Sequence, residues 1–206
     1  MARSKSSANW LNEHVHDVYV HQAKADGYRA RAAYKLSEIN EKDRLIHPNT
    51  VLVDLGSAPG SWCQVASGLI GAEGKIFALD ILEMPPVPHV TFIQGDFREE
   101  AILNTLIQAL HGRPLDLVLS DMAPNMTGER HTDQARSYYL CELALEFAKE
   151  RLKVGGDFVV KVFQGSDFQP YLKAMKAEFE TVISRKPKAS RDRSTEIYLI
   201  GKNKLP

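Results

Sequence analysis

Aspartates stand at the ends of several apolar, strand-like segments of this chain, among them Asp80, Asp96 and Asp121. The carboxyl ends of parallel strands meet at one edge of a sheet, where ligands of open α/β proteins bind. We expect Asp80 to accept hydrogen bonds from ribose hydroxyls and Asp96 to accept one from an adenine amino group. A single aspartate after a strand is more often a turn or helix-cap residue, but their succession favours a nucleoside site.

The first apolar segment ends in a glycine turn that reads DLGSAPG, with Gly56 and Gly60 four residues apart. Glycine lets a ligand approach the backbone closely. The spacing is not the G-x-G-x-x-G of dinucleotide sites, and Pro59 removes one N–H donor at the start of the helix. The turn therefore suits a nucleoside without phosphates better than NAD, although alone it could be a purely structural turn. With the aspartates that follow, the layout is typical of methyltransferases that bind S-adenosylmethionine.

Two charged residues, Lys161 and Glu196, lie inside apolar strand-like segments near the C-terminal end of the chain. Burying a lysine is costly unless it is paired, so Lys161 is a candidate for chemistry. The alternative is an edge-strand lysine that points to water. Lys35 lies on an N-terminal helical segment and would, on its own, be a solvated helix lysine.

Four stretches of the chain resemble the FtsJ/RrmJ family, and within it the bacterial ribosomal RNA 2′-O-methyltransferases. They are Asp54–Trp62, Ser120–Gly128, residues 161–165 and Arg185–Tyr198. The resemblance runs over almost the whole chain, from about Trp10 to Gly201. Ser61 departs from the family, which often has a second glycine there, and we expect cofactor binding to survive this change.

The resemblance implies the site residues. The family's catalytic Lys-Asp-Lys-Glu tetrad maps onto Lys35, Asp121, Lys161 and Glu196. The contacts to S-adenosylmethionine fall on the glycine turn and the strand ends, namely Gly56, Gly60, Trp62, Asp80, Asp96 and Asp121. Asp121 would thus lie between cofactor and substrate, and no metal is implied.

The expected chemistry is transfer of a methyl group to a ribose 2′-hydroxyl, which is a poor nucleophile until its proton is removed or shared. Lys161 is the group we expect at that oxygen. It could act as a neutral base, or as a charged group that stabilises the developing alkoxide. Lys35 and Glu196 would position Lys161 or the ribose in either case.

Apolar runs and breakers predict the elements that position these residues. We expect seven strands, at 50–55, 75–80, 89–96, 114–121, 157–163, 181–186 and 195–201. Helices are expected at about 9–24, 31–42, 61–71, 98–110, 132–152 and 168–179, with Gly155 and Gly156 ending the fifth.

Alternation of strands and helices predicts an α/β protein with a Rossmann-like fold, in which helices cover both faces of a mostly parallel sheet. The last two strands are expected to pair as an antiparallel hairpin at one edge. We treat the chain as a single methyltransferase domain, with a helical extension at 1–49 and a core at 50–206.

Charge is balanced overall but not locally: residues 51–169 hold 9 basic and 16 acidic side chains, whereas residues 170–206 hold 9 and 4. Basic clusters neutralise phosphates, so we expect RNA contacts near the tetrad. The candidates are Arg29, Arg31, Arg191 and Arg193. A solvated basic loop is the alternative.

Other classes of protein fit less well. A nicotinamide-dependent oxidoreductase would need the missing glycine fingerprint, and a non-catalytic RNA-binding or assembly factor would not need the tetrad. Transfer RNA and mRNA-cap 2′-O-methyltransferases share the tetrad and remain alternatives. We predict a monomer without membrane or metal partners, with buried, reduced cysteines at 63 and 141. It would act in the cytoplasm on a uridine of large-subunit ribosomal RNA, on the assembled subunit.

Overall fold

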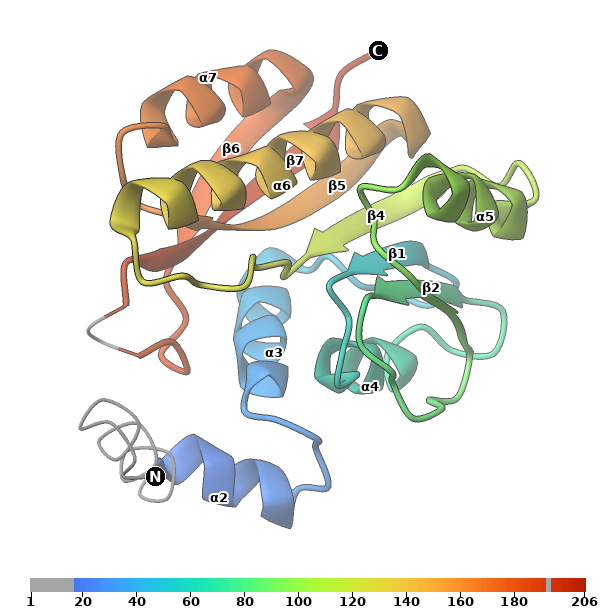
Figure 1. Cartoon of the computed structure of the whole chain (residues 1–206). Coiled ribbons are helices and arrows are strands. Elements are labelled where there is room, and N and C mark those ends of the chain that lie inside the picture. The colour runs from blue at the N-terminus through green and yellow to red at the C-terminus, as the bar shows by residue number, and fades with distance from the viewer. Residues whose placement is uncertain (1–16, 192–193) are drawn as a thin grey trace.

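The computed structural model describes residues 17–191 and 194–206, in which helices and strands alternate along most of the chain (Figure 1). The predicted helix at 9–24 lies partly outside these residues. The strands are β1 (Val51–Leu55), β2 (Lys75–Asp80), β3 (Val90–Gln94), β4 (Leu115–Ser120), β5 (Leu152–Phe163), β6 (Phe179–Arg185) and β7 (Glu196–Lys204). The helices are α2 (Val18–Ala25), α3 (Ala32–Asp43), α4 (Ser61–Ser67), α5 (Glu100–Leu110), α6 (Arg130–Arg151) and α7 (Phe168–Glu178).

The strands form a seven-stranded sheet in the order β3-β2-β1-β4-β5-β7-β6, which confirms the Rossmann-like fold. β1 to β5 pair in parallel, and strand order reverses between β1 and β4. β7 pairs antiparallel with both β5 and β6. The expected antiparallel β6–β7 hairpin at one edge of the sheet is confirmed, with β6 as the edge strand and β7 between β5 and β6.

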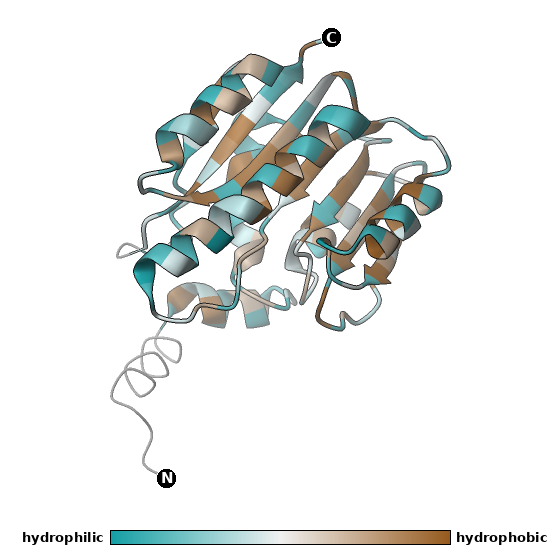
Figure 2. Cartoon of the chain, turned by 45° about the horizontal axis from the view of Figure 1, so that its top comes forward, coloured by the Kyte–Doolittle hydropathy of each residue, from teal (hydrophilic) through white to brown (hydrophobic). Residues whose placement is uncertain are grey.

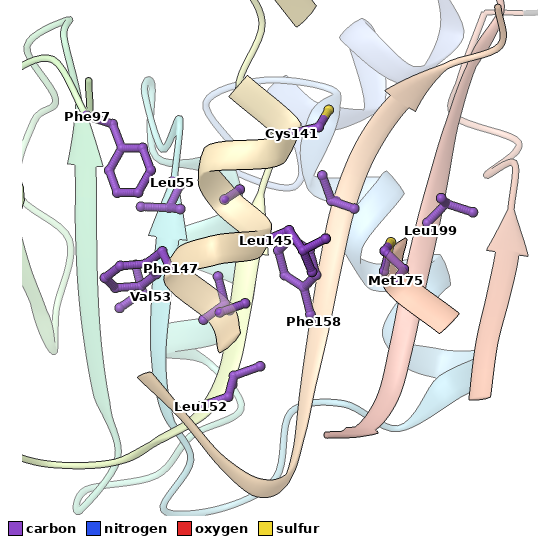
Figure 3. Packing of buried hydrophobic residues seen from close by; sticks show 14 of the residues in the cluster. Val53, Leu55, Phe97, Cys141, Leu145, Phe147, Leu152, Phe158, Met175 and Leu199 are labelled. Carbon is purple, nitrogen blue, oxygen red and sulfur yellow. The ribbon is translucent and has the colours of Figure 1, made fainter. Parts of the chain in front are cut away.

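Helices cover both faces of the sheet, and alternating side chains of each strand serve the two faces. One core joins the sheet to α5, α6 and α7, and includes Phe147, Phe158 and Val160. Figure 3 shows Leu145 and Phe147 of α6 among the buried side chains of this face. The other core joins the sheet to α3 and α4, and includes Leu36 and Tyr198.

This alternation decides where Lys161 points. Its neighbours Val160 and Val162 belong to the core under α6, whereas Val159 belongs to the core under α3. Because side chains alternate along a strand, Lys161 faces α3. The strands in Figure 2 are brown with few teal interruptions, as expected of a sheet covered on both faces.

One strand start and one helix end differ from the sequence prediction. α6 ends at Arg151 and β5 begins at Leu152, so the chain passes through Gly155 and Gly156 as part of the strand. From Leu115 to Leu117 of β4 the pairing partner in β5 moves from Leu152 to Asp157, so the bulge lies in this glycine-containing stretch of β5. α4 ends at Ser67, four residues earlier than expected, and a turn leads to Gly71.

Candidate active site

The glycine turn after β1 lies beside the point where strand order reverses, and backbone contacts hold it there. The N–H groups of Gly56 and Ser57 donate to the carbonyl oxygen of Leu79, at 2.9 and 3.2 Å. Asp80 accepts from Ala58 N–H and Leu82 N–H, each at 2.8 Å. Asp80 therefore stabilises the turn through these hydrogen bonds, and it lies at the end of β2, where the ribose is expected to bind.

Gly56 and Gly60 both have left-handed backbones and close neighbouring atoms. At Gly56, where φ is 79°, a Cβ atom would lie 2.7 Å from the backbone nitrogen of Met122. At Gly60, where φ is 101°, it would lie 2.5 Å from a guanidinium nitrogen of Arg29. The left-handed backbone favours glycine at both positions, and at Gly56 the backbone of Met122 leaves no space for a side chain.

Buried oxygen atoms without a protein partner surround this turn. They are Asp54 Oδ1, Ser57 Oγ and Ser61 Oγ, and none has a hydrogen-bond partner within 17–191 and 194–206. Asp54 is only 1% exposed. Buried polar atoms are normally hydrogen-bonded, so these three oxygens fit a polar ligand seated on the turn.

The Asp54 carboxyl, missed as a site residue in the sequence, is the most perturbed acid of the turn. Burial raises its pKa to about 7, and the charges of Asp121 and Asp80 add to the rise. The thiol of Cys63 donates to its second oxygen at 3.2 Å. A cationic ligand would favour the ionised form of this carboxyl, which suits the sulfonium and ammonium groups of S-adenosylmethionine.

Asp96 and Trp62, which were also predicted to contact the cofactor, have partners within the protein. Asp96 holds the guanidinium of Arg98 through both oxygens, and this pairing lowers the pKa of Asp96. The Trp62 side chain is 3% exposed, donates to Ala32 O at 2.9 Å and packs against Tyr198 with ring centroids 5.6 Å apart. Trp62 thus supports the site from below the turn.

Lys161 is buried, 7% exposed, and Asp121 holds it from the end of β4. Its Nζ donates to the backbone oxygen of Asp121 at 2.6 Å and lies 3.1 Å from Asp121 Oδ1. The Asp121 N–H in turn donates to Leu55 O at the end of β1. The Asp121–Lys161 pair therefore lies beside the turn that is expected to hold the cofactor.

Lys35 and Glu196 form a second ion pair, at 2.6 Å, whose side chains are 14% and 13% exposed. α3 packs on the face of the sheet toward which Lys161 points, and this packing carries Lys35 to the strand ends. Ser190 also donates to Glu196, at 3.0 Å. The structure thus brings the four residues of the predicted tetrad together as two ion pairs on one face.

Tyr198 links the two pairs and was missed in the sequence. Its hydroxyl donates to Asp121 Oδ1 at 2.8 Å, and Lys35 Nζ lies 5.7 Å from its ring centroid. It stands directly opposite Lys161 in the β5–β7 register. The signal available in the sequence was its spacing, because a residue two positions after Glu196 shares the same strand face.

A second missed residue, Asp133 on α6, anchors the loop that follows Asp121. Its carboxylate accepts from the N–H and hydroxyl of Thr127, at 2.7 and 2.8 Å, and from Gly128 N–H at 2.9 Å. These hydrogen bonds lower the pKa of Asp133. The loop between β4 and α6 is therefore fixed at both ends.

Comparison with known proteins supplies the family. Residues 28–204 match the family described as FtsJ-like methyltransferase. The chain belongs to this family. It is 71% identical over 204 residues to the ribosomal RNA large subunit methyltransferase E of Chromobacterium violaceum, covering 99% of this chain and 100% of that one. Its identity to the protein of the same name from Neisseria meningitidis is 65% over 202 residues, or 98% of both chains.

Among solved structures, a ribosomal RNA methyltransferase from Plasmodium falciparum superposes with a TM-score of 0.77. It is 33% identical and covers 86% of this chain and 99% of its own. Both the sequence resemblance and the expected fold are thereby confirmed for this FtsJ-like methyltransferase.

Arg29 of this FtsJ-like methyltransferase, predicted to contact RNA, is instead engaged around the glycine turn. Its guanidinium donates to the carbonyl oxygens of Pro59, Pro85 and Pro86, at 2.8 to 2.9 Å. Three carbonyl acceptors use most of the guanidinium's donor capacity. Arg29 therefore joins the turn after β1 to the loop after β2.

Arg31 is also engaged within the protein, and Arg191 stands near it. Arg31 pairs with Asp17 and donates to Ala189 O. Burial, and next the charge of Arg191, lower the pKa of Arg31. An open pocket between these segments is lined by Arg31, Lys35, Arg191 and Glu196, among others. The fourth predicted RNA contact, Arg193, lies outside the described residues.

Two further expectations concern metals and cysteines. In the described part of the chain, no group of His, Cys, Asp and Glu side chains is arranged to hold a metal ion. Cys63 and Cys141 are both buried and free, as predicted. No helix within residues 17–191 and 194–206 is long and apolar enough to cross a membrane.

Proposed function

We propose that this chain transfers a methyl group from S-adenosylmethionine to the 2′-oxygen of a uridine in large-subunit (23S) ribosomal RNA, on the assembled subunit. Two relatives with 71% and 65% identity, both named ribosomal RNA large subunit methyltransferase E, support the substrate class. Such a substrate calls for an enzyme that works in the cytoplasm, and we propose that it works as a monomer.

The observation that carries the proposal is the pair of contacts between Asp121 and Lys161. The Lys161 Nζ donates to the backbone oxygen of Asp121 at 2.6 Å and forms an ion pair with Asp121 Oδ1 at 3.1 Å. Two contacts with one residue fix where the amino group lies, beside the turn that is expected to hold the cofactor. Asp121 would thus hold Lys161 next to a 2′-hydroxyl placed there, in position to take the proton.

The cofactor supplies, when bound, an electrophilic methyl group on a cationic sulfur. Gly56 and Gly60 would give it a close backbone surface, and the unpartnered Asp54 oxygen would face its positive charge. Asp80 and Asp96 would serve the ribose and the adenine. Asp80 keeps acceptor capacity for this role, since a carboxylate offers about four lone-pair sites.

The second ion pair would position the substrate. Lys35 and Glu196 line the open pocket together with Arg31 and Arg191. Three of these four side chains are cations, and a polyanion entering the pocket would relieve their mutual repulsion. Because Arg29 and Arg31 have partners within the protein, we propose Arg191 as the main RNA contact.

The test is to map 2′-O-methyl groups in ribosomal RNA after incubating the purified protein with labelled cofactor. Large subunits and naked 23S RNA, both from cells that lack the enzyme, serve as alternative substrates. We expect one modified uridine, formed on subunits and hardly on naked RNA. Transfer to transfer RNA or capped mRNA, with none to ribosomal RNA, would overturn the proposal.

Affinity for S-adenosylmethionine is expected to fall as the pH drops from 8 to 6. Burial raises the pKa of Asp54 to about 7, so the carboxyl becomes neutral over this range and loses its attraction for a cation. One pH unit below that pKa, the ionised fraction is about a tenth, so the dissociation constant should rise about tenfold. Isothermal titration calorimetry at several pH values measures it.

The matched control is Asp54→Asn, which should bind weakly with little dependence on pH in this range. Stability gives a second readout. Since the folded pKa of Asp54 lies above that of an ordinary carboxyl, the folded protein binds more protons than the unfolded chain between about pH 4 and 7. This group therefore lowers the unfolding free energy as the pH rises through that window, and Asn should remove this effect. An unchanged pH dependence in the variant would contradict the assignment.

A further inference from the structure

The side chain of Tyr198 is fully buried beneath the two ion pairs of the active site. It is 0% exposed, and its ring packs against Trp62. Burial, and next the charges of Asp121 and Glu196, hold the pKa of its hydroxyl well above the ordinary value. The hydroxyl therefore stays protonated across the working pH range and is a permanent hydrogen-bond donor.

That donor and the amino group of Lys161 meet at the same oxygen atom. Tyr198 Oη lies 2.8 Å from Asp121 Oδ1, and Lys161 Nζ lies 3.1 Å from it. A hydrogen bond from a phenol withdraws charge from a carboxylate oxygen and so weakens its hold on a neighbouring ammonium group. Tyr198 is thus placed to decide how strongly Asp121 binds Lys161.

We propose that Tyr198 is a positioning residue that moderates the Asp121–Lys161 pair, leaving the amino group free to share the proton of the attacking hydroxyl. The inference rests on the proposed function and adds a residue to it. Tyr198 touches neither substrate nor cofactor in this scheme and acts on Lys161 through Asp121, while its hydroxyl also interacts with Glu196 of the second ion pair.

Other titratable groups lie near this pair on both faces of the sheet. Lys35 on α3 and Glu196 on β7 form the second ion pair. Cys141 on α6 donates to the backbone oxygen of Lys161, and burial raises its pKa to about 12, so it stays a thiol. Asp54 on β1 interacts with Asp121 and titrates near pH 7. Asp54 is present in the parent and in both variants described below. Its titration therefore affects all their pH profiles equally and does not contribute to the difference between them.

The experiment compares Tyr198→Phe with Tyr171→Phe. Tyr171 is also buried, and its hydroxyl donates to Cys141 O at 2.8 Å from the opposite face of the sheet. Both substitutions remove a buried hydroxyl and keep the ring, but only Tyr198→Phe removes a hydrogen bond to Asp121. The rate kcat is measured on large subunits as a function of pH and normalised to the sites that bind labelled cofactor, so that misfolded protein does not count.

For Tyr198→Phe we expect the half-maximal pH of kcat to rise by about one unit, which lowers kcat about tenfold below that pH. The KM for S-adenosylmethionine should stay within about twofold, and Tyr171→Phe should match the parent in kcat and in pH profile. A kcat within about twofold of the parent, or a fall without displacement of the pH profile, would overturn the inference. An inactive parent would instead contradict the proposed function.

Discussion

Lys161→Ala is expected to lower kcat for methyl transfer about a thousandfold, which is within the range for losing a positioned general base. The dissociation constant for S-adenosylmethionine should stay within about threefold, because Lys161 contacts Asp121 and none of the residues of the glycine turn. Single-turnover transfer to large subunits, beside equilibrium dialysis with labelled cofactor, measures both quantities.

The matched control for this variant is Lys202→Ala. Lys202 also lies in the β5–β7 region and forms an ion pair, at 2.6 Å from Asp157, but at the far end of the strands. It should lose stability without losing kcat. Near-normal turnover in Lys161→Ala, or an equal loss in the control, would remove Lys161 from the mechanism.

Gly56→Ala is expected to disable the enzyme by a different route. The new Cβ would lie 2.7 Å from Met122 N and 2.8 Å from Met122 Cα, which are backbone atoms that cannot rotate away. Backbone strain and overpacking together should lower the free energy of unfolding by about 3 kcal/mol. Because Met122 follows Asp121, we also expect kcat/KM to fall about a hundredfold through misplacement of the catalytic pair.

The variant Gly71→Ala tests the backbone strain of an alanine at positive φ without the steric clash that is expected at Gly56. Gly71 has a similar φ of 70°, but a Cβ there would meet nothing within 4 Å. Its unfolding free energy should fall by only about 1 kcal/mol, with activity unchanged. Chemical denaturation and steady-state kinetics on both variants test this contrast. Equal effects at the two positions would mean that close approach to Met122 does not matter.

Much of the fold followed from local signals, and the exceptions have physical causes. The strands and helices were predicted because apolar periodicity and breakers are local properties. The position of β7 between β5 and β6 was not predicted from the sequence. It depends on pairing with β5, a strand that lies about 35 residues earlier in the chain. Gly155 and Gly156 were taken as a helix stop, although β5 carries them in a bulge.

The candidate site divides in the same way. Lys161 and Glu196 were found because a charge inside an apolar run is unusual. Tyr198 was missed, because an aromatic residue in a strand is ordinary and its role depends on what lies opposite. Arg29 was taken for an RNA contact because it is a cation near Lys35, whereas its direction is decided by carbonyls 30 and 57 residues away.

The position of β7 has a consequence for biosynthesis. β6 pairs only with β7 in the sheet, and β7 brings both Glu196 and Tyr198 to the site. While the chain is being made, β1 to β5 can form their parallel sheet early, but Lys161 has no neighbour on its open side until the last strand emerges. The predicted tetrad is therefore complete only once β7 has paired with β5, because Glu196 lies on this last strand.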